Sequence, residues 1–198
     1  NKIFNTVKKI GITGGIGTGK TIVSKIFKIL GSPVYNSDEV AKQILLNNKY
    51  VKNEINKHFG NSVVIKGKIN KKKLADKIYE SEINLNFINS LIHPLVDKDF
   101  KAWCMNQNNK YIIKESAIIF KSSSYKELDH IVYVESTIKN RIDRVQKRDK
   151  KSIEEINLII KNQPSDNFFE ENCDFKIKNY ENFFLIDQVL KLHNLFIK

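Results

Sequence analysis

Hydrophobic residues along this chain occur in short apolar runs that alternate with longer stretches of helical periodicity. Five runs predict β-strands, at residues 8–13, 33–35, 111–115, 131–134 and 174–177. After the first run the spacing changes to that of one helix face, formed by Ile22, Val23, Ile26, Phe27 and Leu30. Gly31 follows where a left-handed helix cap belongs. Strands that alternate with helices favour an α/β fold with a parallel sheet.

Residues 39–109 predict a helical insertion between the second and third strands. Its first apolar stripe, Val51, Ile55 and Phe59, ends at Gly60, and residues 61–70 predict a loop or a small hairpin. Asn70 is placed to cap a helix over residues 71–79. A further helix begins near Leu85, and we expect it to break at His93-Pro94, because a proline ring prevents normal helical hydrogen bonding.

The last third of the chain predicts three more helices. A basic helix spans about residues 138–149, and residues 152–155, Ser-Ile-Glu-Glu, form a capping-box pattern that opens the next helix. Residues 184–196 are amphipathic and predict a closing helix.

Composition and charge narrow the class of protein. Hydrophobic residues make up 41% and charged residues 28% of the chain, which is ordinary for a soluble globular protein. No apolar run approaches the ~20 residues that span a bilayer, and residues 1–6 lack the apolar core of a signal peptide, so we expect a cytoplasmic protein without a membrane partner. Cys104 and Cys173 form no metal-ligand cluster and are expected to be reduced and unpaired.

The net charge of +12 comes from 34 Lys and Arg against 22 Asp and Glu. Such a balance can indicate nucleic-acid binding. Here, however, the lysines are spread along the whole chain, so we do not expect nucleic acid as a partner. A small polyanionic substrate would benefit from the same positive field.

Residues 14–21, Gly-Gly-Ile-Gly-Thr-Gly-Lys-Thr, match the pattern G-x-x-x-x-G-K-[ST] and lie between a predicted strand and an amphipathic helix. Glycines let successive backbone N–H groups point at phosphate oxygens, and the positive end of the helix dipole faces the same anion. Lys20 is expected to reach the β- and γ-phosphates of ATP, and the Thr21 hydroxyl to ligate Mg²⁺. The residues expected to bind the nucleotide are Gly15, Ile16, Gly17, Thr18, Gly19, Lys20, Thr21 and Ile22.

A phosphate-binding loop predicts a nucleotide but does not choose the reaction. The guanine-reading Asn-Lys-x-Asp pattern of GTPases is absent from the sequence. The strand-end acid of ATP-driven motors has only one weak candidate, Glu115, and the chain is short for a motor. A small-molecule kinase fits better, because it needs only the loop, an acceptor-binding insertion and a lid.

Two sets of residues are further candidates for the chemistry. Asp38 follows the second strand, where it could orient the acceptor hydroxyl or merely cap the next helix, and its spacing leaves both interpretations open. Arg141, Arg144 and Arg148 share one stripe of the basic helix. We expect Arg141 to lie on a solvated face, whereas the spacing leaves open whether Arg144 and Arg148 contact phosphates.

Several fragments together resemble the dephospho-CoA kinase family over nearly the whole chain. Residues 10–21 are close to the family's Gly-Leu-Thr-Gly-Gly-Ile-Gly-Ser-Gly-Lys-Ser/Thr start, and residues 33–41 resemble its Asp-Ala-Asp segment. Later fragments follow in the family's order, namely Phe59-Gly60, Leu91–Pro94, Arg144–Asp149, Gln163 and Asp174 to Asn179. Their order behind this particular loop makes the resemblance specific.

The resemblance implies a P-loop kinase fold with a five-stranded parallel sheet. Residues 1–36 and 111–198 would form the nucleotide-binding core, residues 37–110 a helical insertion that binds coenzyme A, and residues 138–168 a lid. The activity implied is transfer of phosphate from ATP to the ribose 3′-hydroxyl of dephospho-CoA. Asp38 then matches the family's catalytic carboxylate and Arg144 its lid arginine, while Arg148 would bind the nucleotide and His93 would serve the substrate domain.

Two positions depart from the family's pattern. Asn36 stands where the first acid of Asp-Ala-Asp is expected, and Lys121 stands where an acid is common. Glu115 on the adjacent strand is a candidate to replace the missing carboxylate near Mg²⁺. Two alternatives stay open: a related P-loop kinase acting on a nucleoside monophosphate or another small metabolite, and a basic nucleotide-binding module that touches nucleic acid.

Overall fold

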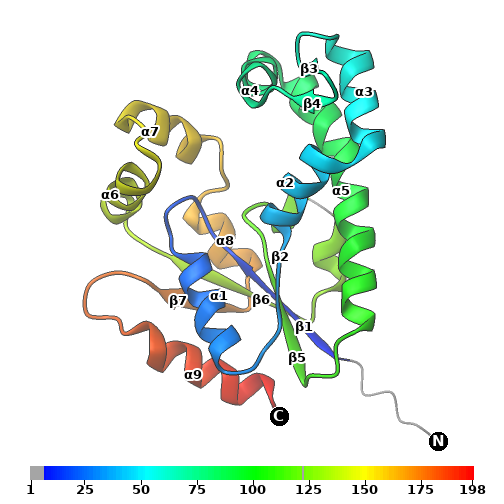
Figure 1. Cartoon of the computed structure of the whole chain (residues 1–198). Helices are drawn as coiled ribbons and strands as arrows, with labels where there is room; N and C mark the ends of the chain where they lie inside the picture. Colours follow the sequence, from blue (N-terminus) through cyan, green and yellow to red (C-terminus); the bar gives the residue numbers. More distant parts are fainter. Residues whose placement is uncertain (1–6, 122) are drawn as a thin grey trace, which may run out of the picture. The chain divides into compact units, whose positions relative to one another are not determined.

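The computed structural model describes residues 7–121 and 123–198, which form two compact units (Figure 1). The sheet unit contains the described residues up to Asn36 together with Asn106–Lys198. The helical unit contains Ser37–Met105. The second unit is therefore inserted into the first, and the chain leaves and re-enters the sheet unit once.

The sheet unit is built on five parallel strands, which confirms the predicted fold class. The strands are β1 (Lys8–Thr13), β2 (Val34–Asn36), β5 (Tyr111–Glu115), β6 (His130–Glu135) and β7 (Phe175–Lys178). Their order in the sheet is β2-β5-β1-β6-β7, and every neighbouring pair is parallel. The central strand β1 pairs Ile10 with both Ile113 and His130. The carboxyl ends of all five strands consequently meet at one edge, where the loop after β1 begins.

Helices accompany this sheet at the positions that the periodicity predicts. They are α1 (Lys20–Ile29), α6 (Ile138–Asp149), α7 (Ile153–Lys161) and α9 (Leu185–Phe196). The capping box at Ser152 forms as expected, and Gly31 has the positive φ of a left-handed cap. The helix α8 (Asp166–Asn172) and the short 3₁₀ turns η1 (Ile119–Lys121) and η2 (Ser123–Glu127) were not predicted.

The core of the sheet unit lies between the sheet, α1 and α9. It contains fully buried aliphatic and aromatic side chains from all three, including Ile10, Ile12, Val23, Phe27 and Val189. Each such side chain contributes about 1.5–3 kcal/mol by leaving water. This burial fixes the end of β1 and the start of α1, and hence the loop between them.

The helical unit consists of α2 (Ser37–Asn47), α3 (Lys49–Phe59), α4 (Lys71–Glu80) and α5 (Glu82–Met105). A small hairpin, β3 (Val64–Ile65) and β4 (Lys68–Ile69), connects α3 to α4. It is one of the two structures, loop or hairpin, that the sequence predicts for residues 61–70. Two asparagines cap helices here. Asn48 accepts from the Val51 N–H at 3.1 Å and Asn70 from the Lys73 N–H at 3.2 Å.

The expected break at His93-Pro94 is wrong, because α5 continues through Pro94 to Met105. Its buried residues Ile88, Ile92, Val96 and Phe100 form one stripe that crosses the proline, and α5 packs against α2, α3 and α4. This burial outweighs the roughly 3 kcal/mol that an internal proline costs a helix. Despite the length of α5, none of the described helices has the apolar span needed to cross a membrane.

The two cysteines are free thiols, as expected. Burial raises the pKa of the Cys173 thiol to about 12. Cys173 therefore carries no thiolate at neutral pH and is a poor nucleophile.

Candidate functional site

The glycine-rich loop connects β1 to α1 at the carboxyl edge of the sheet. Gly17 and Gly19 have positive φ angles of 76° and 98°, which side chains rarely adopt, and α1 begins at Lys20. The Lys20 ammonium donates to the carbonyl oxygens of Gly14 at 2.9 Å and Gly15 at 3.0 Å. The loop thus combines a helix N-terminus, a lysine and a glycine-shaped backbone, the three elements of a phosphate site.

A group of oxygen-bearing side chains lies beside the start of α1. The Thr21 hydroxyl donates to Glu115 Oε1 at 2.7 Å, and the Asn36 amide donates to Glu115 Oε2 at 3.3 Å. Asn36 and Glu115 are register partners at the ends of β2 and β5, and Glu115 is only 3% exposed. The structure thus brings together Thr21, Asn36 and Glu115, whereas the Lys121 side chain is outside its described part.

This group contains a single carboxylate. Among residues 7–121 and 123–198, no cluster of three or more His, Cys, Asp or Glu side chains could hold a metal by itself. Magnesium sites often use only one or two carboxylates together with substrate phosphates and water. The donor set of a threonine hydroxyl and a glutamate is therefore compatible with Mg²⁺ that arrives with a nucleotide.

Arg144 contacts the loop through its backbone carbonyls. One guanidinium nitrogen, Nη1, donates to the carbonyl oxygens of Gly17 and Thr18, each at 3.2 Å, and to the Ser136 hydroxyl at 3.1 Å. The other, Nη2, donates to the carbonyl oxygen of Asn179 at 2.9 Å. Burial lowers the pKa of Arg144. The Asn179 amide also donates to the Thr18 carbonyl, at 2.7 Å.

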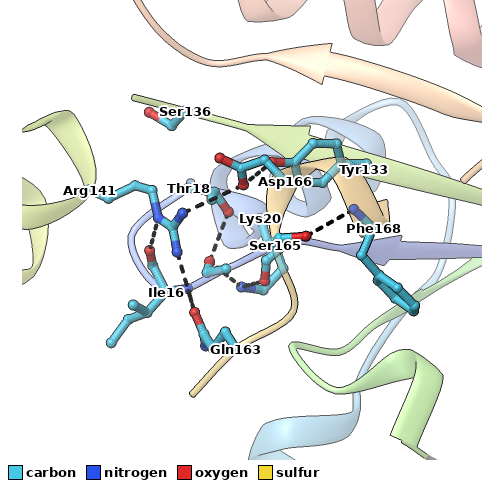
Figure 2. A network of polar contacts seen from close by, with 12 residues as sticks. Ile16, Thr18, Lys20, Tyr133, Ser136, Arg141, Gln163, Ser165, Asp166 and Phe168 are labelled. Atoms are coloured by element: carbon cyan, nitrogen blue, oxygen red, sulfur yellow. Dashed lines mark hydrogen bonds and ion pairs between the residues drawn. The ribbon is translucent and has the colours of Figure 1, made fainter. Parts of the chain in front are cut away.

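Arg141 does not lie on a solvated face, so that expectation is wrong. It is only 3% exposed, and its Nε donates to the Ile16 carbonyl oxygen at 2.9 Å (Figure 2). Its Nη2 lies 3.3 Å from Gln163 Oε1, and its Nη1 lies 3.6 Å from Asp166 Oδ1. The helix α6 approaches the loop closely enough to bury this arginine, which the periodicity of α6 alone did not indicate.

Two further hydrogen bonds, one of them from Tyr133, complete this network, as Figure 2 shows. Gln163 Oε1 accepts from the Ile16 N–H at 2.8 Å, and the Tyr133 hydroxyl donates to Asp166 Oδ1 at 2.6 Å. Burial, followed by this bond to Asp166, raises the pKa of Tyr133 well above its usual range. Sequence reasoning did not assign Gln163, Asp166 or Tyr133 to the loop; only Gln163 carried a signal, its place in the family's order.

The remaining candidates lie elsewhere. Arg148 is on the last turn of α6, mostly exposed, and pairs with Asp149 at 2.7 Å, which raises the pKa of Arg148. Asp38 and His93 belong to the helical unit, in α2 and α5. Because α2 begins at Ser37, Asp38 has a helical position in the first turn and is not itself the capping residue.

The family model and the sequence relatives that match this chain agree on one family. A family model described as dephospho-CoA kinase matches residues 8–183. The dephospho-CoA kinase of Bacteroides fragilis is 38% identical over 185 residues, 93% of this chain and 90% of its own length. That of Fusobacterium nucleatum is 36% identical over 174 residues, covering 87% and 90%.

Solved structures agree in fold. A protein of Thermus thermophilus aligns with a TM-score of 0.85 at 21% identity, covering 96% of this chain and 97% of its own. Dephospho-CoA kinase from Campylobacter jejuni aligns with a TM-score of 0.64 at 19% identity, covering 96% and 98%. At these identities the structural likeness establishes the fold, and the sequence relatives establish the family.

Proposed function

This chain belongs to the dephospho-CoA kinase family and is a phosphotransferase of coenzyme A biosynthesis, and we propose that Lys20, Asp38 and Arg144 carry out its reaction. The reaction is transfer of the γ-phosphoryl group of ATP to the ribose 3′-hydroxyl of dephospho-CoA, which gives coenzyme A and ADP in the last step of that pathway. The match of the family model over residues 8–183 is the observation that carries the assignment. Since ATP and its acceptor are intracellular metabolites, we place the enzyme in the cytoplasm.

The loop from Gly15 to Ile22 binds the phosphates of ATP in this proposal. Its N–H groups and the N-terminus of α1 supply donors, and the Lys20 ammonium, which lies against the Gly14 and Gly15 carbonyls, turns toward the β- and γ-phosphates. Arg144 adds a positive charge directly behind Gly17 and Thr18. Both cations stabilise negative charge that grows on the transferred group.

Mg²⁺ would be held by Thr21, with Glu115 beside it, and Asn36 would contribute an amide oxygen instead of the family's carboxylate. The 2.7 Å contact between the Thr21 hydroxyl and Glu115 supports this choice, because it gathers two hard oxygen donors at the start of α1. When bound, the ion neutralises charge on the β- and γ-phosphates.

The helical unit supplies the binding site for the phosphate acceptor in this proposal. We propose that residues 37–110 bind dephospho-CoA, with Asp38 accepting the proton of the 3′-hydroxyl and His93 serving the substrate-binding fold. In the chain, Asp38 follows the last residue of β2 by two positions, and parallel sheets place their ligands beyond the carboxyl ends of their strands. Residues 138–168 would form the lid, and Arg148 would contact the nucleotide from it.

The test is an assay of ADP release with dephospho-CoA, AMP, CMP and adenosine as acceptors. We expect rapid turnover with dephospho-CoA alone, and Lys20→Ala should reduce it on the order of 10²–10³-fold while the fold stays intact. The exposed Lys191, which lies on α9 in the sheet unit, gives a matched control, Lys191→Ala, with unchanged turnover. Faster turnover with AMP or CMP, or an active Lys20→Ala enzyme, would contradict the proposal.

A further inference from the structure

Three consecutive peptide groups of the phosphate-binding loop are held by side chains from behind. The carbonyl of Ile16 accepts from Arg141, that of Gly17 from Arg144, and that of Thr18 from both Arg144 and Asn179. In a planar trans peptide, the carbonyl of one residue and the N–H of the next point in opposite directions. Holding these carbonyls on one side therefore turns the N–H groups of residues 17, 18 and 19 to the other side.

Arg141 is itself held in place, which makes it more than a passive neighbour of the loop. Asp166 faces its Nη1 and Gln163 its Nη2, and Asp166 is in turn bonded to the Tyr133 hydroxyl (Figure 2). Gln163 also accepts from the Ile16 N–H. The N–H of Ile16 is thus bonded to Gln163 and its carbonyl oxygen to Arg141. A buried charge bonded on three sides has little freedom to move.

Two glycines of the loop lie so close to Arg141 that a side chain would not fit in their place. A methyl group added at Gly15 would collide with the Arg141 guanidinium and would lie 3.0 Å from Gln163 Oε1. One added at Gly17 would lie 2.6 Å from the Arg141 carbonyl oxygen. Residues 15 and 17 are variable positions of the phosphate-loop pattern. The glycine at position 15 is needed here to admit the Arg141 guanidinium, and the glycine at position 17 admits the Arg141 backbone in addition to adopting a positive φ.

We infer that Arg141 and Gln163 are positioning residues that hold the phosphate-binding loop in its anion-binding conformation before ATP arrives. The inference rests on the proposed function, since it assumes that the loop binds ATP. Neither side chain touches the nucleotide in this role. Both act through the Ile16 peptide groups, and Asp166 keeps Arg141 oriented. A purely structural role would lower stability without changing the affinity of the loop for phosphates.

The experiment compares Gln163→Met, Arg141→Met and Gly15→Ala with the unmodified enzyme. Affinities for ATP and for inorganic tripolyphosphate are measured by calorimetry, and KM is measured for dephospho-CoA. The loss of one well-formed bond to the loop should weaken ATP and tripolyphosphate binding about tenfold, by the same factor for both. The KM for dephospho-CoA should stay within about twofold, because the change is confined to the phosphate side.

Gln188 provides a matched control. Its Oε1 accepts from the Lys178 N–H at 2.8 Å, the same distance and bond type as Gln163 with Ile16. Because Gln188 Nε2 also donates to the carbonyl oxygens of Lys178 and Phe184, Gln188→Met should lower the melting temperature at least as much as Gln163→Met and leave ATP affinity unchanged. If Arg141→Met fails to fold, Gln163→Met and Gly15→Ala still decide the question.

A double-mutant cycle gives the second measurement. Gly15→Ala should cost less affinity when Arg141 is already methionine than in the native background, because both changes disturb the contact between Arg141 and the loop and only the crowding of Gln163 remains. Additive losses, or ATP affinity within about twofold of native in Gln163→Met, would overturn the inference. An unmodified enzyme that binds neither ATP nor tripolyphosphate would instead overturn the proposed function.

Discussion

Asn36→Asp would restore the acid that the family has at this position, yet we expect it to destabilise this protein without Mg²⁺. The Asn36 amide donates to Glu115 Oε2 at 3.3 Å, and an aspartate cannot donate that bond. The substitution therefore replaces a hydrogen bond with two carboxylates facing each other. They would lie at the ends of paired strands beside a glutamate that is 3% exposed, where solvent screens them poorly.

The expected cost follows from the distance. Two unit charges about 3.3 Å apart repel by roughly 5 kcal/mol at an effective dielectric constant of 20. Uptake of one proton by the pair limits the cost, because protonating an ordinary carboxyl group at pH 7 takes about 4 kcal/mol. We therefore expect the free energy of unfolding to fall by about 2–4 kcal/mol. For a chain of this size, that lowers Tm by roughly 5–15 °C.

Thermal unfolding in EDTA and in excess Mg²⁺ measures the effect. Mg²⁺ should recover most of the lost Tm in Asn36→Asp and change the native protein little, since only the variant has two carboxylates to neutralise. Asn36→Ala is the control, because it removes the hydrogen bond without adding charge, and its smaller loss should not respond to Mg²⁺. The reasoning would be refuted if the two variants had the same Tm in EDTA, or if the Tm of Asn36→Asp did not change on addition of Mg²⁺.

Three further predictions concern catalysis, the lid and α5. Asp38→Asn should lower kcat by about 10²–10⁴-fold at unchanged Tm, whereas full activity would leave Asp38 a helix-terminus residue. With ATP and dephospho-CoA bound, hydrogen exchange of the lid should slow mainly over residues 146–161. Arg141 and Gln163, which flank this segment, are already bonded to the loop without ligands. Unchanged exchange over residues 146–161 would argue against a lid. Pro94→Ala should raise the unfolding free energy by up to about 3 kcal/mol in denaturant titrations, and a loss would show that α5 needs the proline.

The architecture was predictable because its signals are local. The five apolar runs, the capping residues Ser152 and Asn70, and the glycine at position 31 each determine a strand or a helix end from a few neighbouring residues. The phosphate-binding loop was predictable for the same reason, since its whole pattern lies within residues 14–21.

The errors share a different cause, which is contact between residues far apart in the chain. Arg141 has the spacing of an exposed helix residue, and only the approach of the loop 125 residues earlier buries it. Pro94 has the local chemistry of a helix end, and packing of α5 against three other helices keeps it helical. The short α8 has a serine cap at Ser165 but too few residues to show periodicity.

The position of β1 at the centre of the sheet sets the order in which the molecule can assemble. Ile10 pairs with Ile113 and His130, so β1 leaves the ribosome before its partner strands, which are synthesised about a hundred residues later. At 5–20 residues per second, that wait lasts roughly 5–25 s. Throughout it, an apolar strand with two unpaired edges is open to association with other chains. Lys8 and Lys9, directly before Ile10, are placed as gatekeepers, whose charges oppose such association until the sheet closes around the strand.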